Sequence, residues 1–145
     1  MRVVVQRVAE ASVRVAEAVV GECGRGFVAL VGVAVGDDER AAIHLAGKVV
    51  RLRVFEDENG RFARSLLEVR GDVLVVSQFT LLADTRKGSR PSFTAAAAPE
   101  VAEPLYERFC EALEGEGVAV SRGLFGARMQ LSLVNDGPVT IVLDA

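Results

Sequence analysis

Two short segments of the sequence place polar residues where a β-strand is normally apolar. In the first, Val75–Leu81, Ser77, Gln78 and Thr80 follow a run of β-branched residues. Hydroxyl, amide and backbone N–H groups gathered at a strand end can line a pocket and hydrogen-bond a reacting carbonyl. Strict alternation places Gln78 and Thr80 opposite Ser77 and Phe79, so a shared pocket requires a bend or bulge near Gln78. Taken alone, this segment is better interpreted as a strand with ordinary, hydrogen-bonded polar residues than as a functional site.

The second segment, Leu133–Thr140, contains Asn135 and the dipeptide Gly137-Pro138, followed by Val139. One interpretation is a turn before an edge strand, because glycine permits unusual backbone angles and proline cannot donate a ladder hydrogen bond. The other interpretation is that a rigid Gly-Pro peptide directs carbonyl oxygens at a ligand. Taken alone, this segment favours the turn.

The side chains of the common catalytic sets are scarce. His44 is the only histidine, and its spacing from Lys48 is typical of a helix surface or packing position, which leaves a Ser-His or Cys-His arrangement without its base. Cys23 and Cys110 are the only cysteines, so we predict two reduced core residues rather than a zinc site. The chain has no Walker loop or dinucleotide fingerprint. The sequence therefore predicts no metal and no cofactor.

Composition predicts one globular domain over residues 1–145, with 50% hydrophobic and 26% charged residues. The longest uncharged apolar run, 26–36, is too short to cross a bilayer, and charge appears too early for a signal peptide. We therefore expect a cytoplasmic protein without a membrane partner. With 17 Lys and Arg against 20 Asp and Glu, nucleic acid must be bound by a local patch, for which Arg86, Lys87 and Arg90 are the candidates.

Hydrophobic patterning predicts seven or eight strands. The largely apolar run Phe27–Val35 is typical of a strand that is covered on both faces. The other main strands are predicted at residues 2–8, 12–20, 72–79, 118–121, 128–134 and 139–143.

Two main helices are predicted between these strands. The first begins after a cap at Asp37 or Asp38. The second covers Pro99–Leu113, although Pro104 is tolerated only in a first turn or at a bend, which permits a start as late as Glu103. Strands and helices do not alternate as they do in a doubly wound fold. The predicted class is α+β, with mainly antiparallel, β-barrel-like sheets packed with two main helices.

Together, the two polar segments resemble the paired signatures of the D-aminoacyl-tRNA deacylase family. These are a Ser-Gln-Phe-Thr-Leu run at Ser77–Leu81 and an Asn-x-Gly-Pro-Val-Thr run at Asn135–Thr140. The resemblance extends over nearly the whole chain, including Met1–Val8, the Lys87–Phe93 loop and Gly123–Met129. Two motifs in the family's order, in a chain of the family's usual length, make the resemblance specific.

The resemblance implies hydrolysis of the ester that joins a D-amino acid, or glycine, to the terminal adenosine of tRNA. Thr80, Gln78 and Phe79 are then the candidate catalytic residues, and Ser77 contributes to substrate binding. Because an aminoacyl ester is already reactive and carries a neighbouring ribose 2′-hydroxyl, positioning and oxyanion stabilisation by backbone N–H groups can suffice. Thr80 acting as a covalent nucleophile is the competing mechanism, and it lacks an evident general base.

The resemblance also implies a homodimer with active sites at the subunit interface. Gly137 and Pro138, flanked by Asn135 and Val139, complete the pocket of the other subunit through a Gly-cisPro peptide. Rigid carbonyls there can hold the substrate ammonium and leave no room for an L side chain, which rejects the wrong hand. Aminoacylated tRNA is the implied partner. From their charge, the loop residues Arg86, Lys87 and Arg90 are the candidates for contacting it, and solvated loop charge is the equally weighted alternative.

Two other classes of function remain open at this point. One is a non-catalytic RNA-binding β-barrel that uses the cationic loop, and the other is an oligomerisation module. Neither needs the polar cluster at Ser77–Thr80. Incubation with D-aminoacylated tRNA separates them from an enzyme.

Overall fold

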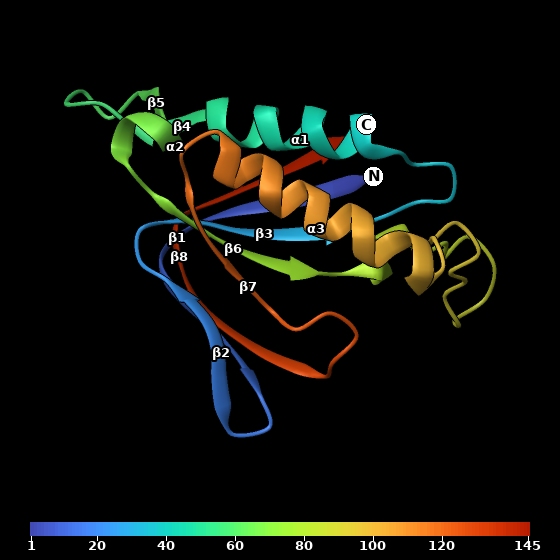
Figure 1. Ribbon diagram of the computed structural model, residues 1–145. Coiled ribbons are helices and arrows are strands. Elements are labelled where there is room, and N and C mark those ends of the chain that lie inside the picture. The colour runs from blue at the N-terminus through green and yellow to red at the C-terminus, as the bar shows by residue number, and fades with distance from the viewer.

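A long strand, β1 (Arg2–Val15), organises the sheet that dominates the chain (Figure 1). The computed structural model describes residues 1–145. β8 (Met129–Asp144) pairs with β1 along nearly its whole length, while β3 (Gly26–Gly32) pairs with its first half and β2 (Ala18–Cys23) with its second. Three strands are therefore held in register by one.

Parallel pairing extends the sheet beyond β3. The strand order is β2-β1-β3-β6-β7, and β6 (Asp72–Ser77) runs parallel to both β3 and β7 (Ala119–Arg122). Parallel neighbours need crossover connections, which contain α1 (Glu39–Arg51) and α3 (Pro99–Gly115). The smaller elements are β4 (Arg53–Glu56), β5 (Phe62–Ser65), α2 (Leu66–Val69) and the 3-10 turn η1 (Phe79–Leu82).

Two hydrophobic cores fill the two faces of the sheet. α1 and α3 cover one face, where 24 buried residues form the larger core (Figure 1). β6 alternates between the cores, because Val73 and Val75 belong to the larger one and Leu74 and Val76 to the smaller. The smaller core consists of Val8, Ala11, Val13, Val28, Leu74 and Val76.

The predicted fold class is confirmed, with a curved, mainly antiparallel sheet packed with two main helices. β3 is buried on both faces, as its apolar sequence predicts. Asp38 caps α1, since its carboxylate accepts a hydrogen bond from the Ala41 N–H at 3.1 Å. None of the helices combines the length and apolar character that crossing a membrane requires.

The second main helix starts at the earlier of the two positions that the sequence allows, and not as late as Glu103. α3 begins at Pro99, a first-turn position that proline favours, and Pro104 lies inside the helix. The side chain of Pro104 is exposed. Its ring therefore interrupts the helix only on the solvent side, where water can satisfy the carbonyl that proline leaves unpaired.

The strand break predicted within residues 2–20 is misplaced. β1 runs without a break to Val15, and the chain reverses at Ala16-Glu17, where Ala16 has a φ of 54°. Residues 9–11, which separate the two predicted strands, stay within β1 because β8 pairs with β1 across this stretch. Continuous pairing thus overrides the local pattern.

The turn predicted near Asn135–Pro138 is a bulge within one strand. Val8 of β1 pairs with Asn135, whereas Gln6 pairs with Thr140. Arg7 alone therefore faces the four residues 136–139, which loop out of the ladder. The chain does not reverse here, because β1 provides a partner strand on both sides of the bulge.

Candidate active site

A cavity of about 580 Å³ opens where β6 ends, beside η1 and the first turn of α3. Twelve of its 17 lining residues are hydrophobic, and none of the 17 carries a titratable side chain. The lining includes Val31, Val33, Val76, Ser77, Gln78, Phe79, Thr80, Phe93, Ala96, Ala97, Phe125, Met129 and Leu131. The cavity can therefore exclude water from a substrate but cannot supply a side-chain base or a charged acid.

A bend at Gln78 brings the first polar segment to this cavity. β6 ends at Ser77, and Gln78 has φ −144° and ψ 74° before the chain enters η1. The Gln78 N–H donates to the Val31 carbonyl at 2.7 Å, which fixes the bend against β3. Ser77, Gln78, Phe79 and Thr80 all line the cavity as a result, although strand alternation alone would separate them.

The amide of Gln78 is directed at Thr80. Its Nε2 donates a hydrogen bond to the Thr80 Oγ1, so the hydroxyl proton of Thr80 remains free to be donated elsewhere. No imidazole or carboxylate lines the cavity to accept that proton. This geometry suits Thr80 as a hydrogen-bond donor better than as a nucleophile.

Aromatic rings form the walls of the cavity. The half-exposed Phe79 ring meets Phe93 edge-on, with ring centroids 5.1 Å apart. Phe125, which also lines the cavity, contacts the buried Tyr106, whose hydroxyl donates to the Val75 carbonyl at 2.9 Å. Neither Phe93 nor Phe125 was given a role in the site from the sequence alone. Phe93 directly follows a polar loop, and an aromatic residue in that position is a signal of burial.

The second polar segment lies apart from the cavity of its own chain. The Gly137–Pro138 peptide is cis and both residues are exposed, on a surface shared with Arg7 and Asp136. Arg7 is buried, and its Nε donates to the Asp136 carbonyl at 3.0 Å. None of Asn135, Gly137, Pro138 and Val139 lines the cavity. One chain thus presents a pocket and, elsewhere on its surface, the exposed Gly137–Pro138 bulge.

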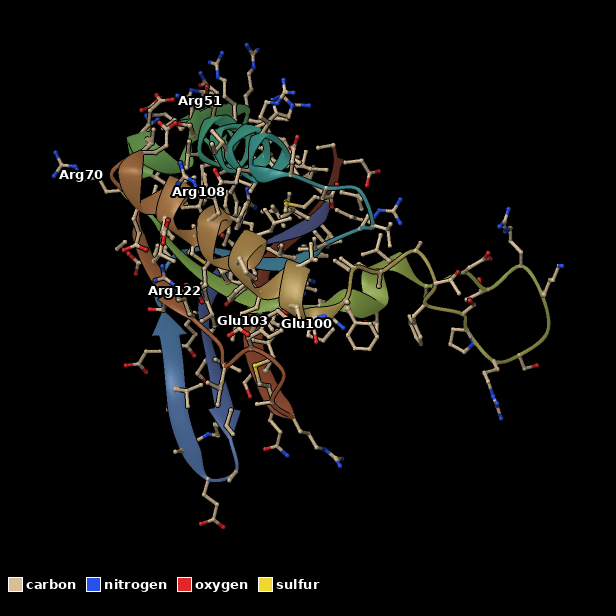
Figure 2. All side chains as sticks on the ribbon, turned by 45° about the vertical axis from the view of Figure 1, so that its right-hand side comes forward. Arg51, Arg70, Glu100, Glu103, Arg108 and Arg122 are labelled. Atoms are coloured by element: carbon tan, nitrogen blue, oxygen red, sulfur yellow. The ribbon has the colours of Figure 1, made fainter.

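The three candidate cations lie on an exposed loop that does not line the cavity. This olive loop projects away from the helices with nitrogen-tipped side chains pointing outward (Figure 2). Arg86 is engaged within the loop by Asp84, at 2.7 Å between Nη2 and Oδ2, and this contact lowers the pKa of the Asp84 carboxyl. Lys87 and Arg90 form no ion pair within the chain, so their charges remain available to a polyanion.

The remaining reactive side chains are remote from the cavity. His44 is exposed on α1 beside Lys48 and Arg51. Burial raises the pKa of Cys110 to about 12 and, with help from the Asp72 charge, that of Cys23 to about 11. Neither thiol lines the cavity, and both stay protonated near neutral pH.

Fold and cavity together define the class of protein: an α+β protein with an apolar pocket that ends in neutral polar groups. Comparisons with known proteins then identify the family. The family model described as D-Tyr-tRNA(Tyr) deacylase matches residues 4–144. The chain therefore belongs to the D-Tyr-tRNA(Tyr) deacylase family.

Individual relatives cover the whole chain. D-aminoacyl-tRNA deacylases from Roseiflexus castenholzii and Thermus aquaticus are 59% and 56% identical over 145 residues, which is 100% of this chain and 92% and 95% of theirs. A solved structure titled c-Myc DNA Unwinding Element Binding Protein is 40% identical, has a TM-score of 0.93 and covers 100% of this chain and 99% of that one. A probable eukaryotic D-amino acid tRNA deacylase, 24% identical with a TM-score of 0.86 and coverages of 99% and 98%, shares the fold.

The raised thiol pKa values predict slow alkylation in the folded protein. At pH 8, a shift from 9.0 to about 11 lowers the thiolate fraction of Cys23 roughly hundredfold, and Cys110 reacts more slowly still. Iodoacetamide labelling followed by peptide mass spectrometry measures both rates, with the urea-unfolded chain as control. Labelling of folded Cys23 at the unfolded rate would show that the thiol is activated rather than suppressed.

Proposed function

We propose that this protein hydrolyses the ester of D-aminoacyl-tRNA, and of glycyl-tRNA, to free amino acid and tRNA. The observation that carries the proposal is the cavity itself, because Ser77–Thr80 end an apolar pocket without any titratable side chain. Such a pocket suits a substrate that is reactive on its own and needs placing rather than activation. Family membership supplies the substrate class.

Backbone N–H groups of η1 are the proposed oxyanion donors. The first N–H groups of a helical turn have no partner within the turn, which leaves those of Phe79 and Thr80 available. They lie on cavity-lining residues beside the Gln78–Thr80 hydrogen bond. Donors fixed in this way stabilise negative charge on the ester oxygen without reorganising during the reaction.

The ribose 2′-hydroxyl of the substrate is proposed to assist attack by water. It lies next to the scissile ester in the terminal adenosine, and the cavity offers no competing base. A covalent route through Thr80 remains the alternative, and it would require a base from outside the residues that line the cavity.

Chiral selection is proposed to come from a second subunit. The exposed Gly137–Pro138 bulge does not line the pocket of its own chain, and in a homodimer the two protomers can exchange these bulges. Carbonyl oxygens of the turn would then hold the substrate ammonium and occupy the space into which an L side chain projects. Glycine has no side chain to clash, so the same geometry accepts it.

Matched D- and L-tyrosyl-tRNA test the proposed activity directly. We expect the wild type to release D-tyrosine at least about a hundredfold faster than L-tyrosine, because a steric clash of about 2.7 kcal/mol already gives this ratio. The His44→Ala variant serves as a control and should retain the wild-type rate within about twofold. Binding of tRNA without ester loss would favour a non-catalytic RNA-binding module, and neither binding nor hydrolysis would favour an oligomerisation module.

Unpaired cations of the exposed loop are predicted to contact tRNA phosphates. Replacing Lys87 and Arg90 by Gln should flatten the dependence of log Kd on log salt by up to about two units, since each phosphate contact contributes about 0.9. Arg86→Gln is the matched control and should have less effect, because Asp84 already neutralises Arg86. Filter binding of uncharged tRNA at several salt concentrations gives the slopes. Unchanged slopes in the double variant would mean that the loop cations are merely solvated.

Exchange of turns between subunits predicts complementation. Gly137 has a φ of 126°, and an added Cβ would lie 3.1 Å from the Val139 nitrogen, so Gly137→Ala should distort the bulge and lose activity on D-tyrosyl-tRNA. Gln78→Ala should disable only its own pocket. Mixing the two inactive variants after unfolding should restore about a quarter of the sites, since half of the dimers are mixed and each holds one intact pocket. If no activity returns, although sedimentation confirms mixed dimers, the turn acts within its own chain.

A further inference from the structure

η1 lies over one row of three neighbouring residues in the sheet. In the register of the ladder, Arg2 of β1 pairs with Gly32 of β3 on one side and with Asp144 of β8 on the other. Residues paired across strands point to the same face of a sheet. We call the row Asp144, Arg2 and Gly32 the η1 seat.

Gly32 allows η1 to approach the sheet closely. A Cβ built on Gly32 would lie 3.0 Å from the Gln78 carbonyl oxygen, 3.2 Å from Leu81 Cβ and 2.5 Å from a terminal carbon of Leu82. The leucine tip could move aside, but the Gln78 carbonyl belongs to the backbone of the bend itself. Any larger residue at position 32 must therefore displace the turn that carries Phe79 and Thr80.

Arg2 holds the far end of the same turn. The Asp84 N–H, which could have continued the turn by bonding the Leu81 carbonyl, donates instead to the Ser92 carbonyl at 2.8 Å. Arg2 Nη1 donates to the Leu81 carbonyl at 3.2 Å in its place. A cation at the carboxyl end of a helical turn also interacts favourably with its dipole.

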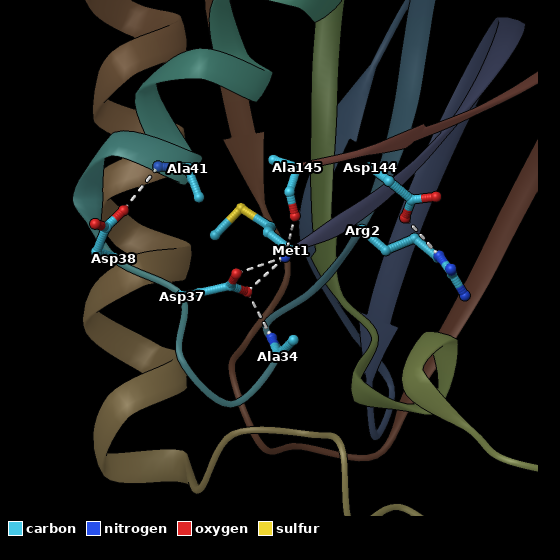
Figure 3. Close-up of polar contacts among 8 residues, drawn as sticks. All are labelled: Met1, Arg2, Ala34, Asp37, Asp38, Ala41, Asp144 and Ala145. Carbon is cyan, nitrogen blue, oxygen red and sulfur yellow. Dashed lines mark hydrogen bonds and ion pairs between the residues drawn. The ribbon is translucent and has the colours of Figure 1, made fainter.

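Asp144 fixes the direction of the Arg2 side chain. Its Oδ1 accepts a hydrogen bond from Arg2 Nε at 2.7 Å, and the pair is drawn in Figure 3. The guanidinium thus donates through Nε to Asp144 and through Nη1 to the Leu81 carbonyl. Its planar array of N–H groups allows both bonds at once, and a lysine ammonium does not reproduce this geometry. The carboxylate raises the pKa of Arg2, so the link is charged at any physiological pH.

We propose that Arg2, oriented by Asp144 and opposite Gly32, is a positioning residue that sets the place of the η1 backbone donors in the reaction. The inference rests on the proposed deacylase function, because η1 carries the candidate oxyanion donors. Arg2 does not line the cavity. A small displacement of η1 weakens stabilisation of the transition state more than binding of the tRNA, whose contacts lie elsewhere.

Arg2→Met tests the role of Arg2, with Arg14→Met as a matched control. Arg14 lies on the same strand and also donates through Nη1 to a backbone carbonyl at 3.2 Å, that of Glu17, outside the cavity lining. For deacylation of D-tyrosyl-tRNA, Arg2→Met should lower kcat about tenfold and leave KM within about twofold, whereas Arg14→Met should change neither. Arg2→Lys should restore only part of kcat. A normal kcat in Arg2→Met, or equal losses in both Met variants, overturns the proposal.

A double-mutant cycle tests the role of Asp144. If Asp144 acts only through Arg2, Asp144→Asn should lower kcat in the wild type and have no further effect in Arg2→Met. If the effects of the two substitutions on kcat are fully additive as free energies, Asp144 does not act by orienting Arg2.

Hydrogen exchange separates failure of this inference from failure of the proposed function. In Arg2→Met, the amides of Leu81 and Ala83, which donate to Gln78 and Thr80 carbonyls, should exchange about tenfold faster, and in Arg14→Met they should not change. Gly32→Ala should show the same signature if it folds. If the wild type lacks deacylase activity but exchange is faster in Arg2→Met, the support of η1 by Arg2 is upheld and the proposed function is rejected. If exchange is unchanged in Arg2→Met, the support of η1 by Arg2 is rejected whatever the activity.

Discussion

Pairing of β8 with the full length of β1 is the constraint on which the remaining architecture depends. It forces the surplus residues opposite Arg7 to loop out of the ladder, and this bulge presents Gly137–Pro138 at the surface. At the other end of the same ladder, it aligns Asp144 with Arg2 and so with η1. One strand pair therefore shapes both the exposed turn and the support beneath the cavity.

The cavity relies on backbone placement instead of side-chain ionisation. Its lining has no group that titrates, and the two thiols are held protonated by burial at sites outside it. Oxyanion stabilisation by fixed N–H groups depends steeply on position, because the donors must meet charge that exists only in the transition state. In the proposed mechanism, this dependence gives a role to the three contacts that converge on η1: the Val31 carbonyl, the bare face of Gly32 and the Arg2 guanidinium.

The sequence predicts local features well and long-range features poorly. The buried β3 and the Asp38 cap follow from patterns within a few residues, and the required bend near Gln78 follows from strand alternation. The bulge at residues 136–139 does not, because glycine and proline signal a local departure from the ladder without revealing that β1 continues alongside.

Cavity walls are also beyond local patterns. Phe93 and Phe125 reach the cavity through loop paths that depend on distant contacts, namely the Asp84–Ser92 bridge and the packing against Tyr106. The first family motif, Ser77–Leu81, located the polar end of the pocket, whereas its apolar sides became visible only in three dimensions. The engagement of Arg86 by Asp84 likewise depends on a loop conformation that composition does not specify.

Removal of the 2′-hydroxyl from the substrate tests the central claim, that the protein positions a self-assisting ester and supplies no side-chain base. Single-turnover deacylation would be compared for D-tyrosyl-tRNA ending in adenosine and for the same tRNA ending in 2′-deoxyadenosine, with binding measured in parallel. Without the 2′-hydroxyl, the rate should fall about a hundredfold or more at unchanged affinity, the scale of a lost proton-transfer group. A deoxy substrate hydrolysed within about twofold of the normal rate would contradict this claim and point to a base supplied by the protein.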